Sequence, residues 1–441
     1  MKRKLFLGIG IPFIIIILII TFVTVYLFAD TPKFKDEPVP EIGTEVGSIS
    51  PNIESQIQDL FSDSGVPSME VGILIGDELV WAKGYGDQPD LSTVYMIGSV
   101  DKPIITTAIL QLVERGLVRL DDDINKYLPF SVRHPDYPDK PITIKMLLAH
   151  TSGLPHDVPG ITTDDFSNNG PWIRWLLKHE FNLSALRKYF FPQTDRSIDR
   201  KFSPENADFW LFEPDPAVPT GEIKHIGDGY QYSNTAFYTL LVRVIEEVSG
   251  QSYVKYISEN IYEPLNMENT SFEISDYPRD QIAIPYEDFG EGLENDLPIT
   301  GMAASGKTRT NIIDLAQFLL IHMNKGSTGG VQILKPETVE LMHGPITSLD
   351  INDFPPSHCT GCGLSWFHFD DSSQGHSGFV AGNCADILYK EGDGNPYGII
   401  ILMTYSGAKT PLVWEWWEKY FVEVRELLFK EAELIASGQQ K

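Results

Sequence analysis

Ser99 and Lys102 have the residue types and the spacing for nucleophilic chemistry. The segment Ser99-Val-Asp-Lys102 stands at the start of an expected helix that runs to about Leu117. Residues three apart share one face of a helix, so the Lys102 amine would lie beside the Ser99 hydroxyl. A lysine whose pKa is lowered by burial is able to take the serine proton and make the hydroxyl a nucleophile. Free backbone N–H groups at the helix start would also bind a developing oxyanion.

Two further motifs hold residues that suit an acyl-transfer site. Tyr232-Ser-Asn234 precedes an expected helix over 235–249; there the phenol would shuttle a proton and Asn234 would donate to a substrate amide. His376-Ser-Gly378 begins an expected strand, where His376 would polarise an acyl group or its carboxylate and Gly378 would let a substrate backbone approach. Each motif alone also fits a structural role, such as an N-cap, a solvated lysine, a core tyrosine or a turn histidine. The functional interpretation depends on their occurring together.

The elements that would position these motifs follow a simple order along the chain. Strand patterns lie near both ends and helical patterns lie between them, which predicts an α+β fold. One antiparallel sheet would be made from both chain ends and flanked by helices, with a mostly helical subdomain inserted at about 118–330. The expected elements are a hairpin over 69–86, strands over 362–369, 379–389 and 397–405, and helices over 53–61, 99–117, 235–249 and 412–436.

The N-terminus predicts a membrane anchor. A basic tip, residues 1–4, precedes an uncharged stretch of 25 residues at 5–29. A helix of that length reaches about 37 Å, enough to cross a bilayer, and it exceeds the apolar region of a secretory signal. We therefore expect an uncleaved transmembrane signal-anchor, in preference to a cleaved signal, with the lipid bilayer as its partner. Basic flanks stay in the cytoplasm, so a linker at 30–52 and the domain at 53–436 would be extracytoplasmic.

Net charge bears on the possible partners of the chain, and the cysteines bear on its cross-links. The chain has 34 basic and 61 acidic residues, a net charge of −27 at pH 7, so it would repel phosphate backbones and nucleic acid is not an expected partner. On an oxidising side of a membrane a disulfide is expected, in which Cys362 pairs with Cys359 or with Cys384. Three free thiols remain an alternative, and so does a zinc site that uses His358 and His368.

The order and spacing of the three motifs resemble the signature motifs of class C β-lactamases. Their relatives share the set: low-molecular-weight penicillin-binding proteins, D-aminopeptidases and lactamase-fold esterases. The resemblance spans about residues 53–430 and implies the β-lactamase/transpeptidase-like fold. Other segments that look like the family's are Ile97-Gly-Ser-Val-Asp-Lys-Pro103, Leu147-Leu-Ala-His-Thr-Ser-Gly-Leu-Pro155, Tyr232-Ser-Asn-Thr-Ala-Phe-Tyr-Thr-Leu-Leu241, Thr308-Arg-Thr-Asn-Ile-Ile-Asp-Leu-Ala-Gln-Phe318 and Gly363-Leu-Ser-Trp366.

The resemblance implies a role for each candidate residue. Ser99 would attack the acyl group of a small-molecule or peptide substrate, while Lys102 and Tyr232 would remove and return protons. The backbone N–H groups of Ser99 and Phe379 would form the oxyanion hole. The remaining motif residues, Asn234 and His376, would orient the substrate. Water would then release the acyl group, with no metal or organic cofactor.

The chain also departs from the family's pattern. The third motif begins with His376, whereas true β-lactamases usually have a lysine there; a mostly neutral histidine is less suited to an antibiotic's carboxylate. Peptidase or esterase activity is therefore favoured over efficient β-lactam hydrolysis. The connection from Pro214 to Gly229 is longer than usual and would reshape the pocket.

Two alternatives stay open on the sequence alone. Gly375-His-Ser-Gly378 nearly forms the G-x-S-x-G elbow of α/β-hydrolases, which would make Ser377 the nucleophile, but position 379 is Phe and no alternating parallel βα pattern surrounds it. A catalytically inactive protein of the same fold that binds cell-wall or peptide ligands is the second alternative.

Overall fold

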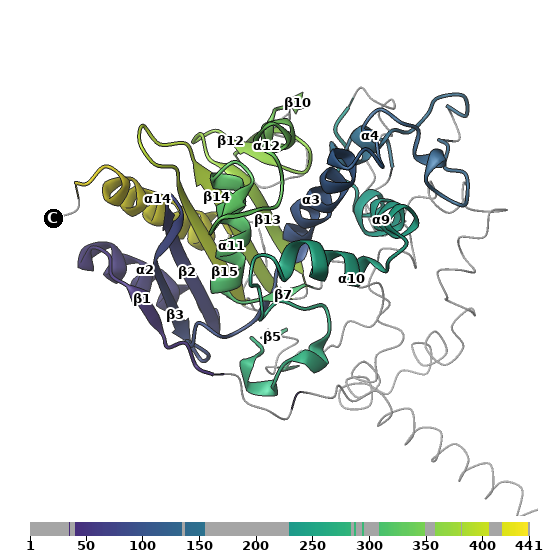
Figure 1. Cartoon of the computed structure of the whole chain (residues 1–441). Helices are drawn as coiled ribbons and strands as arrows, with labels where there is room; N and C mark the ends of the chain where they lie inside the picture. The colour runs from purple at the N-terminus through teal and green to yellow at the C-terminus, as the bar shows by residue number, and fades with distance from the viewer. Residues whose placement is uncertain are drawn as a thin grey trace, which may run out of the picture.

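The computed structural model describes residues 40–134, 137–154, 229–283, 308–348, 358–380, 382–404 and 417–439, together with Lys35, 286–287 and 293–294. Within these ranges the main feature is a nine-stranded antiparallel sheet in the order β1-β3-β2-β15-β14-β13-β12-β11-β10 (Figure 1). Its strands are β1 (Glu45–Gly47), β2 (Ser68–Ile75), β3 (Glu78–Gly86), β10 (Thr347–Ser348), β11 (Cys359–Cys362), β12 (Phe367–Phe369), β13 (Gln374–Val380), β14 (Asn383–Lys390) and β15 (Tyr397–Thr404).

The centre of the sheet joins the two ends of the chain. Strand β2 pairs with β15 in a register that sets Ile73 opposite Ile399 and Val71 opposite Ile401. Every residue of β15 is buried, because helices cover both faces of the sheet here, and this explains the continuous apolar run from 397 to 403. The sheet made from both chain ends is therefore confirmed.

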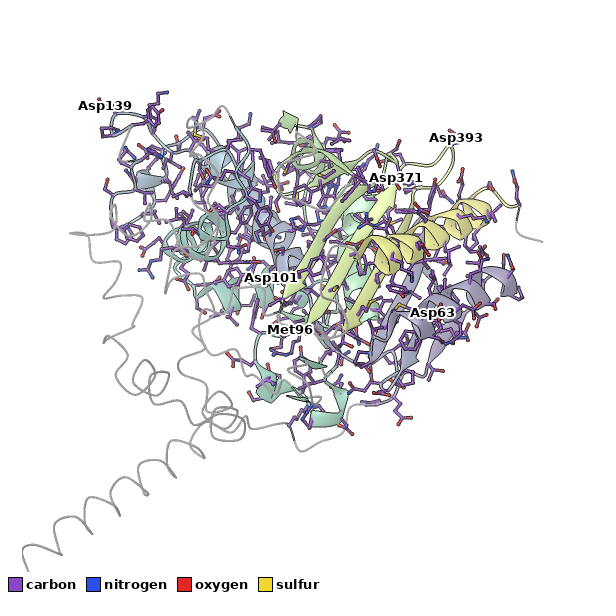
Figure 2. All side chains as sticks on the ribbon, turned by 180° about the vertical axis from the view of Figure 1, so that it is seen from behind. Asp63, Met96, Asp101, Asp139, Asp371 and Asp393 are labelled. Carbon is purple, nitrogen blue, oxygen red and sulfur yellow. The ribbon has the colours of Figure 1, made fainter. Side chains whose placement is uncertain are left out.

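Helices cover the two faces of this sheet. Helix α11 (Ile312–Met323) packs on one face, where the missing side chain of Gly72 leaves room for Ile312. On the other face α14 (Glu423–Ala436) packs against β2 and β15 and against α2 (Pro51–Ser64), as the view from behind shows (Figure 2). Each face thus has its own apolar core, and β2 contributes to both by alternation: Val71 and Ile73 belong to one core and Leu74 to the other.

The helical part lies beside the sheet around α3 (Asp101–Glu114), which is buried along most of its length (Figure 1). Helix α3 packs against α9, α10 and the π-helix η4. The other helical elements are η1 (Gly98–Val100), η2 (Ile124–Lys126), α4 (Ile144–Leu148), η4 (Ala236–Leu241), α9 (Val242–Ser249), α10 (Tyr253–Ile257), η5 (Ser258–Tyr262), η6 (Ile274–Asp276), η7 (Arg279–Gln281), α12 (Pro336–His343) and η8 (Trp417–Val422). Short strand pairs are β4 (Tyr95–Met96) with β7 (Arg309–Thr310), β5 (Tyr286–Glu287) with β6 (Leu293–Glu294), and β8 (Ser327–Thr328) with β9 (Val331–Gln332).

Several expected boundaries are wrong. The expected strand 379–389 is a hairpin of β13 and β14, and the expected strand 362–369 is the end of β11, a loop and β12. The expected linker 30–52 is too long, because residues 45–47 already pair with β3. The expected helical subdomain 118–330 also extends too far, since α11 packs on the sheet.

The cysteine expectation is wrong as well. All three cysteines are buried free thiols. Cys359 and Cys362 lie in the same extended strand, where three residues span about 10 Å, beyond the reach of a disulfide. Cys384 lies three strands away in the sheet order, at about 14 Å by strand spacing.

The expected membrane segment at 5–29 and most of the long connection at 214–229 lie outside the described residues. Among the helices that the structure describes, none combines the length and the apolar character needed to span a bilayer.

Candidate active site

Ser99 lies where the sheet and the helical part meet. It stands in the 3-10 turn η1, between β4 and the first turn of α3, and its side chain is partly exposed. Figure 2 labels Met96 and Asp101 on either side of this turn. The strand before this turn, β4, pairs with β7. The Ile97 N–H, at the start of the turn, donates to Thr308 O at 3.1 Å. The expected helix therefore begins at Asp101, two residues after the candidate nucleophile.

The backbone of β13 crosses directly over this turn. A Cβ on Gly378 would stand 2.0 Å from Ile97 O and 3.0 Å from the Ser99 backbone nitrogen. A Cβ on Gly98, whose φ is +55°, would stand 2.8 Å from the Phe379 backbone nitrogen. Only glycine at both positions permits this approach, and it brings the backbone amides of Ser99 and Phe379 to one place. Strand β12 pairs with β13 only at 374–375, so the edge of β13 at the turn has no partner from β12.

Lys102 is fully buried one helical turn after Ser99. Its amine donates to Ser99 Oγ at 2.9 Å, to Asn234 Oδ1 at 2.7 Å and to the Tyr238 hydroxyl at 3.1 Å. A buried amine within hydrogen-bond distance of a serine hydroxyl is the arrangement in which a lysine acts as a base.

Tyr232 contacts the same amine through its aromatic face. Lys102 Nζ lies 4.6 Å from the centre of the Tyr232 ring, and the tyrosine is partly exposed. On its other side the ring stacks on His150, with centroids 4.5 Å apart and planes 21° apart. Ser99, Lys102, Tyr232 and Asn234 thus come from two separate segments of the chain and meet around one amine.

His150 holds the tyrosine loop at three consecutive residues. Its carbonyl accepts from the Gln231 N–H at 2.7 Å, its ring stacks on Tyr232, and its Nδ1 accepts from the Ser233 N–H at 3.1 Å. The last bond requires an unprotonated Nδ1. His150 has a φ of +56°, which is costly for a residue with a side chain and is often found at functional sites.

His376 lies buried next to this group on β13. Its Nδ1 donates to Ser377 O at 2.6 Å, and its ring packs on Phe367 at 4.6 Å. Burial, together with the charge of Lys102, lowers the pKa of His376 to about 3. The third motif therefore presents a neutral imidazole near pH 7, and its buried Nε2 has no hydrogen-bond partner among the residues that the structure describes.

Comparison with known proteins places this geometry in a family. Residues 53–412, well over half of the chain, match the family model described as Beta-lactamase. The chain belongs to the beta-lactamase family.

Several solved structures share the fold of this chain. An octameric penicillin-binding protein homologue from Pyrococcus abyssi aligns with a TM-score of 0.60 at 24% identity, over 87% of this chain and 78% of that one. A D-amino acid amidase from Ochrobactrum anthropi aligns with a TM-score of 0.58 at 20% identity, over 88% and 99%. A beta-lactamase/D-alanine carboxypeptidase from Yersinia pestis aligns with a TM-score of 0.58 at 18% identity, over 86% and 99%. The β-lactamase/transpeptidase-like fold implied by the motifs is thereby confirmed.

Curated proteins are similar to this chain at the level of sequence. Protein flp of Staphylococcus aureus (strain MRSA252) is 25% identical over 378 residues, which cover 81% of this chain. The match covers 64% of Protein flp, so this chain spans somewhat less than two thirds of that relative. Beta-lactamase-like protein 2 of Dictyostelium discoideum is 25% identical over 315 residues, covering 68% of this chain and 50% of that protein.

Sequence reasoning missed two residues at this beta-lactamase-family site. Tyr238 had no visible signal, because its position depends on a π-helix, which apolar periodicity does not distinguish from an α-helix. His150 lies in a segment that resembles the family's, but the sequence does not show its role. Its positive φ and its stack on Tyr232 depend on packing between segments more than 80 residues apart.

The alternative sites find no support in the structure. Ser377 lies in the middle of β13, paired with Asp386, and it is buried instead of standing at a strand-to-helix turn. For the zinc alternative, His358 contacts Asp370 and His368 contacts the carbonyl of His343. Within the described ranges, no group of three or more His, Cys, Asp or Glu side chains gathers to hold a metal ion.

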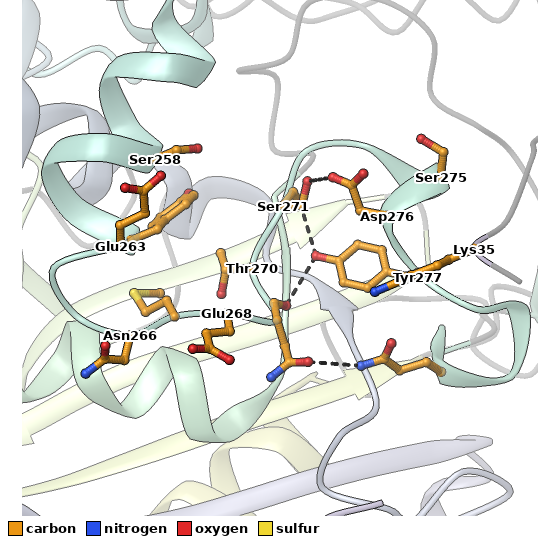
Figure 3. Close-up of a pocket in the computed structure, with 14 residues that line it drawn as sticks. Lys35, Ser258, Glu263, Asn266, Glu268, Thr270, Ser271, Ser275, Asp276 and Tyr277 are labelled. Carbon is orange, nitrogen blue, oxygen red and sulfur yellow. Dashed lines mark hydrogen bonds between the residues drawn. The ribbon is translucent and has the colours of Figure 1, made fainter. Parts of the chain in front are cut away.

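A cavity of about 810 Å³ lies apart from these residues, along the segment from η5 to η7 (Figure 3). Its rim includes the exposed carboxylates of Glu263, Glu268 and Asp276, and Ser271 donates a hydrogen bond to Asp276. None of the residues that the motifs single out lines this cavity, so it is a feature separate from the candidate active site.

Proposed function

We propose that the protein is a membrane-anchored, extracytoplasmic serine hydrolase that forms an acyl-enzyme on Ser99 from an amide or ester substrate. The observation that carries the proposal is the hydrogen bond of 2.9 Å between the buried Lys102 amine and the partly exposed Ser99 hydroxyl. A buried amine in contact with an accessible serine is the arrangement that a nucleophile and its base require.

The proposed reaction uses only groups of this chain. Lys102, assisted by Tyr232, takes the proton of Ser99 Oγ as the oxygen forms a bond to the acyl carbon. The two backbone amides at the crossing of β13 and η1, those of Ser99 and Phe379, stabilise the oxyanion. Proton return from Lys102 and Tyr232 releases the amine or alcohol, and a water molecule then attacks the acyl-Ser99 ester with the same groups as base.

The neutral state of His376 bears on the substrate class. A site for a substrate carboxylate favours a fixed cation, whereas His376 is uncharged near pH 7 because of its burial. This supports D-peptides, amides of D-amino acids or esters over β-lactams as preferred substrates. The D-amino acid amidase among the structural neighbours is consistent with an amide substrate.

Labelling with an active-site serine probe tests the nucleophile and its partners. We expect the wild-type protein to take the label and Ser99→Ala to take none. Lys102→Ala and Tyr232→Phe should lower acyl transfer by about two to four orders of magnitude, as is usual for lost proton-transfer groups. Unlabelled wild-type protein would favour the binding-only alternative, and a labelled Ser99→Ala protein would assign the reaction to another residue.

A substrate panel tests the assignment of substrate class. A chromogenic cephalosporin, a short acyl ester and a D-Ala-D-Ala peptide are compared as kcat/KM in wild type and in His376→Lys. We expect the wild type to prefer the ester or the peptide, and His376→Lys to gain cephalosporin turnover relative to the ester. A wild type that hydrolyses the cephalosporin best would contradict this part of the proposal.

The membrane anchor rests on the basic tip at 1–4 and the apolar segment at 5–29. We expect the full-length chain to sediment with membranes and to be cut by a protease added outside intact cells. Deletion of residues 1–29 should release it to the soluble fraction. A full-length protein that stays soluble, or one protected in intact cells and cut only after lysis, would overturn the anchor or its orientation.

A further inference from the structure

Tyr238 makes a contact that the three motifs do not explain. Its hydroxyl accepts from Lys102 Nζ at 3.1 Å, and the same nitrogen lies 4.4 Å from the centre of its ring. Tyr238 belongs to the π-helix η4, which follows Asn234 and precedes the regular helix α9. Such wide helical turns are rare and occur often at functional sites. The tyrosine is almost completely buried, with 4% of its surface exposed, so the contact is a fixed feature of the interior.

Three acceptors in the described part of the chain bear on where the lone pair of Lys102 points. A lysine ammonium has three N–H groups, and Ser99 Oγ, Asn234 Oδ1 and the Tyr238 hydroxyl lie at hydrogen-bond distance from it. When the amine is neutral, only two N–H groups remain. If Asn234 and Tyr238 hold those two, the lone pair takes the third direction, toward the Ser99 proton.

A single anchor would not achieve this orientation. With Asn234 alone, the amine would rotate about the Cε–Nζ bond, and the lone pair would spend much of its time turned away from Ser99. Reacting groups that are held in the productive geometry react faster than groups that must find it. The second anchor is therefore a means of orienting the base.

We propose that Tyr238 is a positioning residue that holds one N–H of neutral Lys102 and so aims its lone pair at the hydroxyl of Ser99. This inference rests on the proposed function, in which Lys102 takes the serine proton. In that step Ser99 Oγ–H breaks, the proton forms the third N–H of Lys102, and Oγ forms the bond to the acyl carbon. The ammonium later returns the proton to the leaving group, so Tyr238 neither gains nor loses a proton.

The same contact bears on the pH dependence of the base. The groups that face Lys102 are Tyr232 and Tyr238 from the tyrosine segment and its π-helix, and His376 from β13, which is neutral. The buried carboxyl group of Asp101 is the neighbour in sequence on α3. A hydroxyl that accepts from the ammonium stabilises the charged form, so removal of that hydroxyl favours the neutral amine.

Tyr238→Phe is the direct test because it keeps the ring over Lys102 and removes only the hydroxyl. We expect the plateau of kcat/KM for an activated acyl ester to fall about tenfold, with KM nearly unchanged. The acidic limb of the kcat/KM profile, measured from pH 5 to 10, should move to lower pH, because the ammonium form of Lys102 loses one hydrogen-bond acceptor. A change confined to stability would leave the position of that limb where it is in wild type.

Tyr253→Phe is the matched control. Tyr253 is also a buried tyrosine of the helical part, but its hydroxyl has no hydrogen-bond partner among the described residues. We expect Tyr253→Phe to keep both the wild-type plateau and the wild-type acidic limb. Tyr238→Met, which also lacks the hydroxyl, serves as a second variant should Tyr238→Phe fail to fold.

The outcomes separate this inference from the proposed function. If Lys102→Ala keeps wild-type acylation, the proposed function itself fails and the role of Tyr238 fails with it. If Lys102→Ala is inactive while folded Tyr238→Phe matches wild type in plateau and acidic limb, only the role of Tyr238 is overturned. A Tyr238→Phe protein with a lower plateau and a shifted acidic limb supports both.

Discussion

Replacement of His150 by glycine should impair catalysis without touching any reacting atom. The change removes the acceptor of the Ser233 N–H at 3.1 Å and the ring that stacks on Tyr232 at 4.5 Å. A net hydrogen bond contributes about 1 kcal/mol and an aromatic stack about 0.5–1.5 kcal/mol. The two contacts together hold the tyrosine loop with roughly 1.5–2.5 kcal/mol. If this energy keeps Tyr232 in its reactive position, kcat/KM should fall about 10- to 70-fold, because 1.4 kcal/mol corresponds to a tenfold change in rate.

The choice of variants separates the two contacts. Glycine adopts the φ of +56° without strain, so His150→Gly does not confuse lost contacts with a strained backbone. His150→Asn also tolerates that φ and offers Oδ1 to the Ser233 N–H, but it lacks the ring. We expect His150→Asn to lie between wild type and His150→Gly in kcat/KM.

The assay is kcat/KM for an activated acyl ester together with the thermal midpoint of each variant. His134→Gly is the control, because His134 is also buried and packs on a tyrosine, Tyr137, at 5.2 Å in the same helical part. Its loss should lower stability and leave kcat/KM nearly unchanged. A folded His150→Gly protein within twofold of wild type would refute the reasoning.

Three further predictions concern the pH dependence of stability, the backbone crossing and the buried ion pair. Burial lowers the pKa of His322 to about 3. The unfolded chain therefore binds a proton at this residue more readily than the folded protein, and the free energy of unfolding decreases as the pH falls from about 6.5 toward 3. The loss is about 2 kcal/mol at pH 5, and His322→Phe should flatten that dependence in urea unfolding at pH 7 and 5. Gly378→Ala should lower serine labelling at least 100-fold while circular dichroism stays unchanged, since its Cβ would stand 2.0 Å from Ile97 O. Arg425→Leu should lower the free energy of unfolding by about 3–5 kcal/mol, because it leaves the carboxylate of Asp386 buried without its ion-pair partner. A double variant that also carries Asp386→Leu should recover much of this free energy. Equal losses in the single and the double variant would contradict the argument.

The hairpin of β2 and β3 shows what local pattern is able to predict. Alternating apolar residues and a Gly76-Asp77 turn were sufficient to predict the hairpin, although a bulge between Ile73 and Leu74 shifts the register that the turn sets. The hairpin of β13 and β14 was missed because its second strand is buried on both faces and lacks alternation. Gly382, with a φ of +79°, was the one sign of the turn between them.

The site divides in a similar way. Ser99 and Lys102 were accessible to prediction because their spacing is a property of one helical turn. That Asn234 reaches the same amine required the family's order of motifs, since 132 residues separate it from Lys102. The contacts of Tyr238 and His150 were not accessible to prediction, although both residues lie in segments that resemble the family's, because a π-helix and a residue with positive φ leave no periodic trace in the sequence.

The pairing of the first long strand with the last has a consequence for folding during synthesis. The Ser68 N–H donates to Thr404 Oγ1, 336 positions further along the chain, and the edge of β2 that faces away from β3 pairs with β15. At a synthesis rate of roughly 5–20 residues per second, the early hairpin waits on the order of 15–70 s with an open, apolar edge. A topology of such high contact order folds slowly and late. Until β15 is made, that open edge favours association with other chains, and truncation before β15 should yield insoluble protein.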